Sequence, residues 1–126
     1  MNLAASLLLL VFTQFSPANT VVTGKPQITF DHLEHNFGTI KKGEKVTHVF
    51  SFTNTGDADL LIKNVKTTCG CTVGDYNKEP IKPGETDEIK VTFNSNGKHG
   101  RIGKLIDVHT NASIEPIILE IVAFVE

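Results

Sequence analysis

The sequence has no tryptophan, one tyrosine and one methionine, and its other aromatic residues are eight phenylalanines. This composition suits a core of phenylalanine and β-branched residues, and it suits a sugar-stacking surface poorly. The formal net charge is only −2. Nucleic-acid-binding proteins usually carry a basic stripe, whereas the basic residues at 41–42 and 98–101 are typical of solvated turns. We therefore predict no nucleic-acid partner.

Signatures of catalysis are also missing. The chain has no Gly-x-Ser-x-Gly, no glycine-rich phosphate loop and no His-Glu-x-x-His. The acidic residues that could act in pairs fall in predicted turns, with no pocket implied around them, so general acid–base catalysis has no support. They are Asp57, Asp59, Asp75, Glu85 and Asp87. We predict no enzymatic activity, no catalytic residue, no metal site and no cofactor.

Long hydrophobic runs are absent apart from one near the N-terminus. The apolar run at 3–12 is too short to span a bilayer comfortably, and Ser16-Pro17-Ala18 fits the small-x-small pattern before a cleavage point. We interpret residues 1–18 as a secretory signal peptide and 19–26 as a linker, although no Lys or Arg precedes the run. The alternative is a hydrophobic first strand or buried helix. The prediction is an exported protein, periplasmic or secreted, with no transmembrane span.

Beyond residue 18 no segment has helical periodicity, and short strands alternate with turn signals. The clearest strand is 45–53, where Val46, His48, Phe50 and Phe52 share one face. Other strands are predicted at 27–30, 36–40, 60–66, 72–73, 88–93, 101–110 and 116–125, the last covered on both faces. This spacing predicts an all-β, immunoglobulin-like antiparallel β-sandwich of about seven strands over 27–126.

Both cysteines of the chain lie in one stretch, Cys69-Gly70-Cys71. Residues i and i+2 of an extended strand share a face, so the pair could simply pack as small apolar side chains. Gly70 could instead allow the bend that a local disulfide needs. As thiolates the two cysteines could also bind a soft metal such as Cu(I). Alternatively, they could form disulfides with a partner chain. His99 or His109 could complete a metal site only if folding brings one near.

The remaining histidines give weaker signals. His48 lies on the apolar face of its strand, which indicates a core or edge position. His32 and His35 are three residues apart in a predicted loop, and this spacing alone is a poor metal signal.

Several motifs occur together and in a fixed order. They are Phe-Gly-Thr-Ile at 37–40, Lys-Gly-Glu at 42–44, Phe-Thr-Asn-Thr-Gly at 52–56, Cys-Gly-Cys-Thr at 69–72, Pro-Ile-Lys-Pro-Gly-Glu at 80–85, Val-Thr-Phe at 91–93, Gly-Lys at 103–104 and Thr-Asn at 110–111. Together they resemble the bacterial secreted domain-of-unknown-function family 1573, which is similar to the immunoglobulin-like domains of the major sperm protein and Hydin type. The resemblance implies an exported β-sandwich, common in Bacteroidetes-like bacteria, and no catalytic activity.

Two functional hypotheses follow. The first is a non-enzymatic module that binds a protein partner, still unknown, at the bacterial cell envelope. The second is a small thiol-based metal (copper) or redox protein that uses the Cys-Gly-Cys pair. Free-thiol titration and mass measurement before and after reduction would separate them, because a disulfide hides both thiols until it is reduced.

Overall fold

The computed structural model describes residues 24–126. The expected signal peptide and most of the expected linker lie outside this part of the chain. Within it, no helix is long and apolar enough to span a bilayer. The described residues form eight strands: β1 (Ile28–Phe30), β2 (Glu34–Ile40), β3 (Lys45–Asn54), β4 (Ile62–Thr67), β5 (Thr72–Tyr76), β6 (Thr86–Asn94), β7 (Gly100–Thr110) and β8 (Ile117–Val125).

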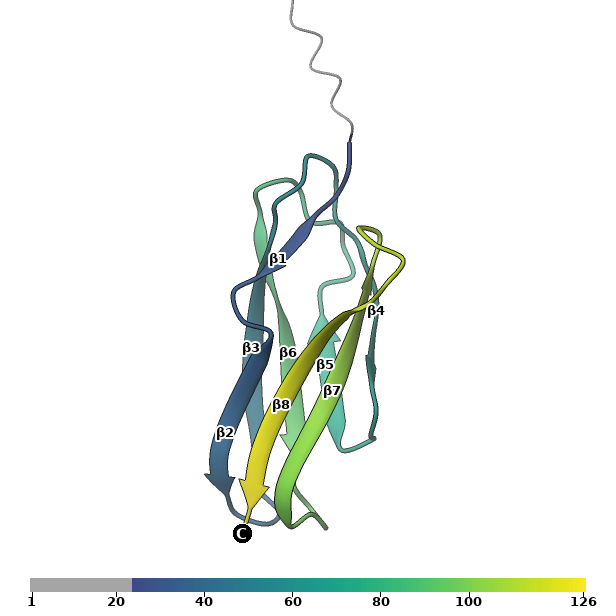
Figure 1. Cartoon of the computed structure of the whole chain (residues 1–126). Coiled ribbons are helices and arrows are strands. Elements are labelled where there is room, and N and C mark those ends of the chain that lie inside the picture. Colours follow the sequence, from purple (N-terminus) through teal and green to yellow (C-terminus); the bar gives the residue numbers. More distant parts are fainter. Residues whose placement is uncertain (1–23) are drawn as a thin grey trace, which may run out of the picture.

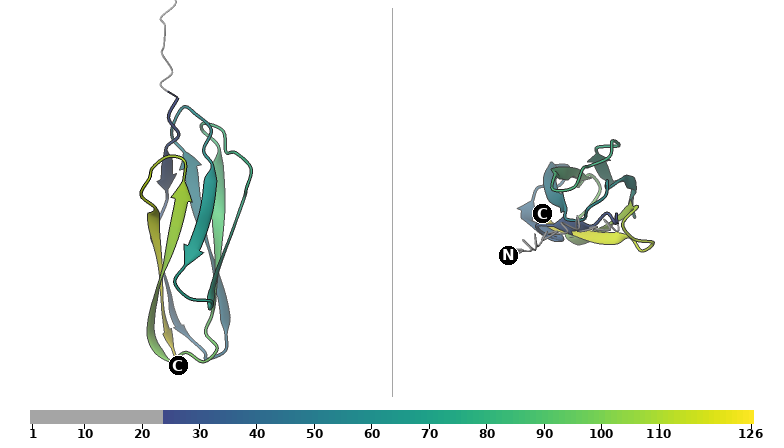
Figure 2. Two further views of the ribbon diagram at one scale, coloured as in Figure 1. Left: turned by 90° about the vertical axis from the view of Figure 1, so that its right-hand side faces the viewer. Right: turned by 90° about the horizontal axis from the view of Figure 1, so that it is seen from above.

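The strands make two four-stranded sheets that pack face to face as a sandwich (Figures 1 and 2). One sheet has the order β1-β3-β6-β5, and the other has the order β2-β8-β7-β4. The predicted immunoglobulin-like sandwich is confirmed, with one difference in detail. We expected only antiparallel pairs, and β2 pairs with β8 in parallel. The reason is that the first strand is split: β1 joins one sheet, and the chain then crosses to the other sheet as β2.

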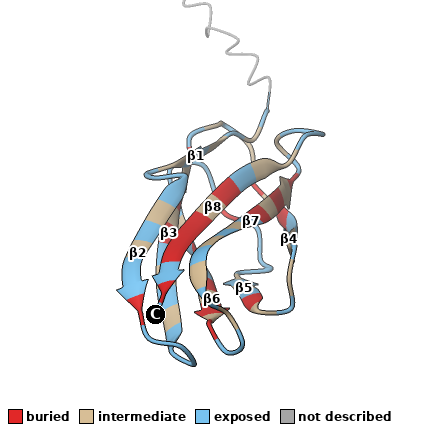
Figure 3. Ribbon diagram, turned by 60° about the horizontal axis from the view of Figure 1, so that its bottom comes forward, coloured by how far each residue is buried: buried red, intermediate tan, exposed pale blue. Residues whose placement is uncertain are grey.

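The core lies between the sheets and follows the predicted alternation. Phe50 and Phe52 of β3 and Ile89, Val91 and Phe93 of β6 are almost fully buried. Across from them, Ile106 and Val108 of β7 and Leu119 and Ile121 of β8 complete the same cluster. Figure 3 shows this burial concentrated on β8 and the middle strands, while β2 is mostly exposed.

The described chain starts at one end of the sandwich and finishes at the other (Figures 1 and 2). Lys25 and Pro26, at the end of the expected linker, already pack on the turn after β3. The backbone N–H of Asp57 donates to the Lys25 carbonyl at 3.1 Å, and the N–H of Thr55 donates to the Gln27 carbonyl at 2.8 Å.

Candidate functional site

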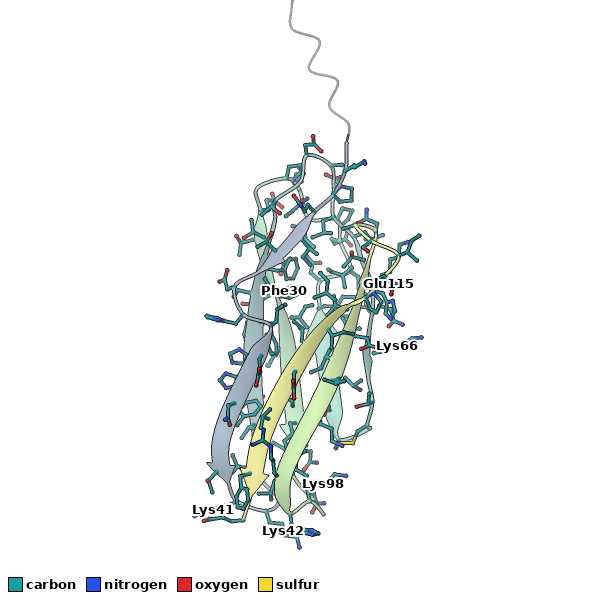
Figure 4. All side chains as sticks on the ribbon, viewed as in Figure 1. Phe30, Lys41, Lys42, Lys66, Lys98 and Glu115 are labelled. Carbon is teal, nitrogen blue, oxygen red and sulfur yellow. A yellow bond between two sulfur atoms is a disulfide. The ribbon has the colours of Figure 1, made fainter. Side chains whose placement is uncertain are left out.

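Cys69 and Cys71 are joined by a disulfide in the turn between β4 and β5. Here the chain passes from one sheet to the other, near the end opposite the entry of the described chain, and the bond is visible in Figure 4. The two Cα atoms are 5.2 Å apart, which is within the normal range for a disulfide. The sequence left packing, a local disulfide, metal binding and a bond to a partner chain open, and the structure has the local disulfide. Sulfurs bonded to each other are not thiolates and cannot bind a metal as thiolates.

The disulfide contributes little to the stability of the fold. It joins residues only two positions apart, and the loop-entropy relation gives about 1.5 kcal/mol for so small a ring, against about 3 kcal/mol for a 15-residue loop. The turn is also closed without it. The N–H of Thr72 donates to the Cys69 carbonyl at 3.1 Å, and the Thr67 hydroxyl donates to the carbonyls of Cys69 at 3.2 Å and Thr72 at 2.9 Å.

Each sulfur has a hydrogen-bond donor next to it. The backbone N–H of Cys71 points to Sγ of Cys69 at 3.1 Å. Sγ of Cys71 is 3.8 Å from the hydroxyl of Thr72, and the hydroxyl is the donor because a disulfide sulfur carries no hydrogen. The Thr72 side chain is buried, and Cys71 packs partly against the core. The two donors therefore face the sulfurs from rigid positions.

Gly70 does not have the role that we expected. Its φ is not positive, and a Cβ added at this residue would meet nothing within 4 Å. The turn is the bend that we thought Gly70 could allow, but it does not depend on the special backbone freedom of glycine. Gly70 is exposed and contributes no side chain to the site.

The histidines do not join the cysteines. His109 lies at the far end of the β4–β7 pair, opposite Asn64, whereas the disulfide turn follows Thr67. Among residues 24–126, no three His, Cys, Asp or Glu side chains are grouped so that they could hold a metal ion.

Two other histidines meet at the side of the sandwich. His35 belongs to β2 and not to a loop, so that expectation was wrong, and its ring stacks on His48 of β3 at a centroid distance of 3.6 Å and an angle of 7°. Phe37 and Phe50 pack edge-on against these rings. Parallel rings in this arrangement cannot share one metal ion, because an ion lies in the plane of each imidazole that binds it. Burial lowers the pKa of His48, and the neighbouring charges of His35 and His32 lower it further.

Two buried polar residues that were not predicted from the sequence hold the loops. The side-chain amide of Asn54 donates to the carbonyls of Ala58 at 2.8 Å and Ile81 at 2.9 Å, while its oxygen accepts from the N–H of Gly56 at 3.0 Å. At the other end, the Ser95 hydroxyl lies 2.7 Å from the carbonyl of Glu44. Asn and Ser are usual turn residues, so only their burial distinguishes them.

The outer face of the β2-β8-β7-β4 sheet carries an apolar cluster that we call the outer patch. It consists of Leu105 of β7 and Ile118, Val122 and Phe124 of β8. The register brings these strands side by side, with Val122 opposite Gly103. Phe124 is 50% exposed, and Leu105 and Ile118 are each 43% exposed. We expected both faces of β8 to be covered; on this outer face Val122 is buried, whereas Ile118 and Phe124 are exposed.

A shallow groove of about 700 Å³ lies near the start of the described chain. Its walls are residues 25–28, 55–57 and the loop after β7, and its charged residues are Lys25 and Asp57. The N–H of Lys25 donates to the Asp57 carboxylate at 2.9 Å, so the acid is already engaged in holding the loop.

Solved structures with this fold come from different proteins. A crystal structure of a protein of unknown function from Porphyromonas gingivalis W83 matches with a TM-score of 0.70 at 16% identity, over 82% of this chain and 48% of that one. The ASH/PapD-like domain 7 of human CEP192 matches with a TM-score of 0.64 at 13% identity, over 82% of this chain and 86% of that one. The VesB protease of Vibrio cholerae matches with a TM-score of 0.59 at 15% identity, over 78% of this chain and 32% of that one.

These likenesses show the fold alone, and the chain spans about half the length of the Porphyromonas protein. None of the curated proteins is significantly similar to the sequence. A family model, described as "Protein of unknown function (DUF1573)", matches residues 28–125, which include all eight strands of the sandwich. The resemblance noted in the sequence motifs is thereby confirmed, and the chain belongs to the DUF1573 family.

Proposed function

We propose that this protein is an exported, non-enzymatic β-sandwich module that binds a protein partner at the bacterial cell envelope. The observation that carries the proposal is the outer patch. Three large apolar side chains, Leu105, Ile118 and Phe124, are about half exposed on two neighbouring strands. Clustered exposed apolar residues are typical of protein-interaction surfaces, whereas single exposed ones are common on any protein.

Charged residues also lie in and beside the patch. Gly103 lies opposite Val122 and has no side chain, and an oxygen of the Glu120 carboxylate reaches to 3.5 Å from where its Cβ would stand. Arg101 is paired with Phe124, and Glu120 with Leu105. Protein interfaces combine apolar and polar contacts in this way. The relatives support a modular role, because similar sandwiches occur as parts of longer chains.

The test is cross-linking in the envelope fraction of the bacterium that makes the protein, with variants of single residues. Leu105→Asp and Phe124→Asp place a charge in the outer patch and should abolish a defined cross-linked species. Val73→Asp is the matched control, because Val73 is 61% exposed on the outer face of the other sheet. Loss of the species in all three variants, or retention in all three, would contradict the assignment of the patch.

A second candidate function is a redox role for the Cys-Gly-Cys pair, which the disulfide between Cys69 and Cys71 favours over a copper-binding role. A hydrogen-bond donor lies next to each of the two sulfurs, which supports this candidate.

A further inference from the structure

The turn that contains Cys69 and Cys71 is closed by hydrogen bonds as well as by the disulfide. Its backbone is closed by the Thr72 N–H and by the Thr67 hydroxyl, and neither bond involves a sulfur. On its other side, the N–H of Asn94 in β6 donates to the Cys71 carbonyl at 2.8 Å. Reduction therefore leaves the two sulfurs in the same turn, close enough to bond again.

The donors at the sulfurs favour thiolates. A hydrogen bond to a charged acceptor is about twice as strong as one to a neutral acceptor, so both donors gain strength when their sulfur becomes a thiolate. For Cys69 the donor is the N–H of Cys71 at 3.1 Å. For Cys71 it is the hydroxyl of buried Thr72 at 3.8 Å. Stabilised thiolates are both better populated as nucleophiles and better leaving groups.

We propose that Cys69 and Cys71 form a reversible dithiol–disulfide site that exchanges electrons with an exposed dithiol of a partner protein. A thiolate of the partner attacks Sγ of Cys69, the bond between the two sulfurs breaks, and Cys71 leaves as a thiolate beside the Thr72 hydroxyl. The second thiol of the partner then attacks the mixed disulfide and releases Cys69. Two electrons and two protons pass from the partner dithiol, which becomes a disulfide, to Cys69 and Cys71.

The reverse direction uses the same groups. The Cys69 thiolate, held by the Cys71 N–H, attacks a partner disulfide, and Cys71 closes the ring and releases the partner as a dithiol. Cys69 is the exchanging sulfur in both directions because Cys71 is the cysteine that packs against the core. The attacked or attacking sulfur must be reachable from solvent.

The first test is a redox titration of the purified full-length protein with dithiothreitol as the probe dithiol. Thiols are trapped by alkylation and counted by mass, and circular dichroism is recorded on the same samples. We expect complete reduction without denaturant, an unchanged strand spectrum, and full reoxidation when oxidised dithiothreitol is added. A disulfide that is reduced only after unfolding, or a sandwich that unfolds when it is reduced, would overturn the proposal.

The second test asks whether the Thr72 hydroxyl, and not only the exposure of the disulfide to solvent, sets the rate of reduction. Thr72→Val keeps the shape of the side chain but removes the hydroxyl, and reduction by dithiothreitol should become slower, because a leaving thiol with a higher pKa leaves more slowly. Thr53→Val is the matched control, because that hydroxyl bonds Thr86 and no sulfur. Equal rates in the two variants would contradict the role of Thr72.

If Thr72→Val does not fold, Cys71→Ser gives the decisive measurement. It keeps the backbone N–H that points to Cys69, and the rate of alkylation of Cys69 against pH reports its thiol pKa. We expect a value below the ordinary value of about 8.5. A value at or above the ordinary one would overturn the proposed thiolate site.

Discussion

Replacing Gly56 by alanine would place a methyl group against the backbone of the segment that leads into β1. A Cβ at this residue would overlap the Lys25 carbonyl oxygen, and it would lie 2.5 Å from the Gln27 nitrogen and 2.8 Å from the Pro26 carbonyl carbon. All three are backbone atoms, so no side chain can rotate away. The segment at 25–27 must therefore move off the turn after β3.

The cost can be estimated from the bonds that this movement breaks. Two hydrogen bonds hold one side of the contact: the Asp57 N–H donates to the Lys25 carbonyl, and the Lys25 N–H donates to the Asp57 carboxylate. Thr55 N–H to the Gln27 carbonyl holds the other. At about 0.5–1.5 kcal/mol for each bond, and with partial relaxation of an exposed segment, we expect Gly56→Ala to lower the free energy of unfolding by about 2–4 kcal/mol.

Urea denaturation followed by circular dichroism measures this loss, and the chain contains its own controls. Gly70→Ala adds the same methyl group where nothing lies within 4 Å, and it should change stability by less than about 0.5 kcal/mol. Gly74→Ala places the methyl 2.6 Å from Cγ1 of Val65. Its cost should be intermediate, and Val65→Ala should partly relieve it. Equal stability of the Gly56 and Gly70 variants would refute the reasoning.

Four further outcomes are expected. Burial lowers the pKa of His48 below 6.5 in the folded protein, so its contribution to stability is complete above about pH 6.5 and is lost as the pH falls toward the folded pKa. The urea midpoint should therefore be lower at acid pH. His48→Gln should make the urea midpoint depend less on pH. Asn54→Ala should lower the free energy of unfolding by about 2–4 kcal/mol, measured in urea, because two buried carbonyls lose their donor. The double variant Cys69→Ser, Cys71→Ser should lose only about 1–3 kcal/mol in the same assay and show no change in metal content by elemental analysis. N-terminal sequencing of the exported protein should begin near Asn19, and an intact N-terminal methionine would contradict export.

Much of the fold could be predicted because its signals are local. The alternation in β3 and β6 reports which side chains face the core, and the register confirms it, with Phe50 opposite Ile89 and His48 opposite Val91. Asn54 could not be recognised in the same way. Asn54 continues the buried alternation of Phe50 and Phe52. Its place beside a turn is explained by the usual preferences of asparagine, so nothing in the local pattern indicates that its side chain bonds the distant Ile81 carbonyl.

The pairing of His35 with His48 was not predictable for a different reason. It depends on the crossing of the chain from β1 in one sheet to β2 in the other, which brings β2 next to the part of β3 that β1 does not pair with. Contacts between strands of different sheets have no period in the sequence. The disulfide was equally open, because residues i and i+2 share a face in a strand, and only the turn found after Thr67 brings the sulfurs together.

The two proposed activities can be tested independently because they lie on different parts of the molecule. The outer patch faces away from the core on β7 and β8, whereas the disulfide turn joins β4 to β5 and bonds to β6. Changes at sites without shared partners usually act additively. Phe124→Asp should therefore leave the rate of disulfide reduction unchanged, and the double serine variant should keep the cross-linked species. If the serine variant loses that species while the sandwich stays folded, the partner is held through the sulfurs, and the outer patch is not the binding surface.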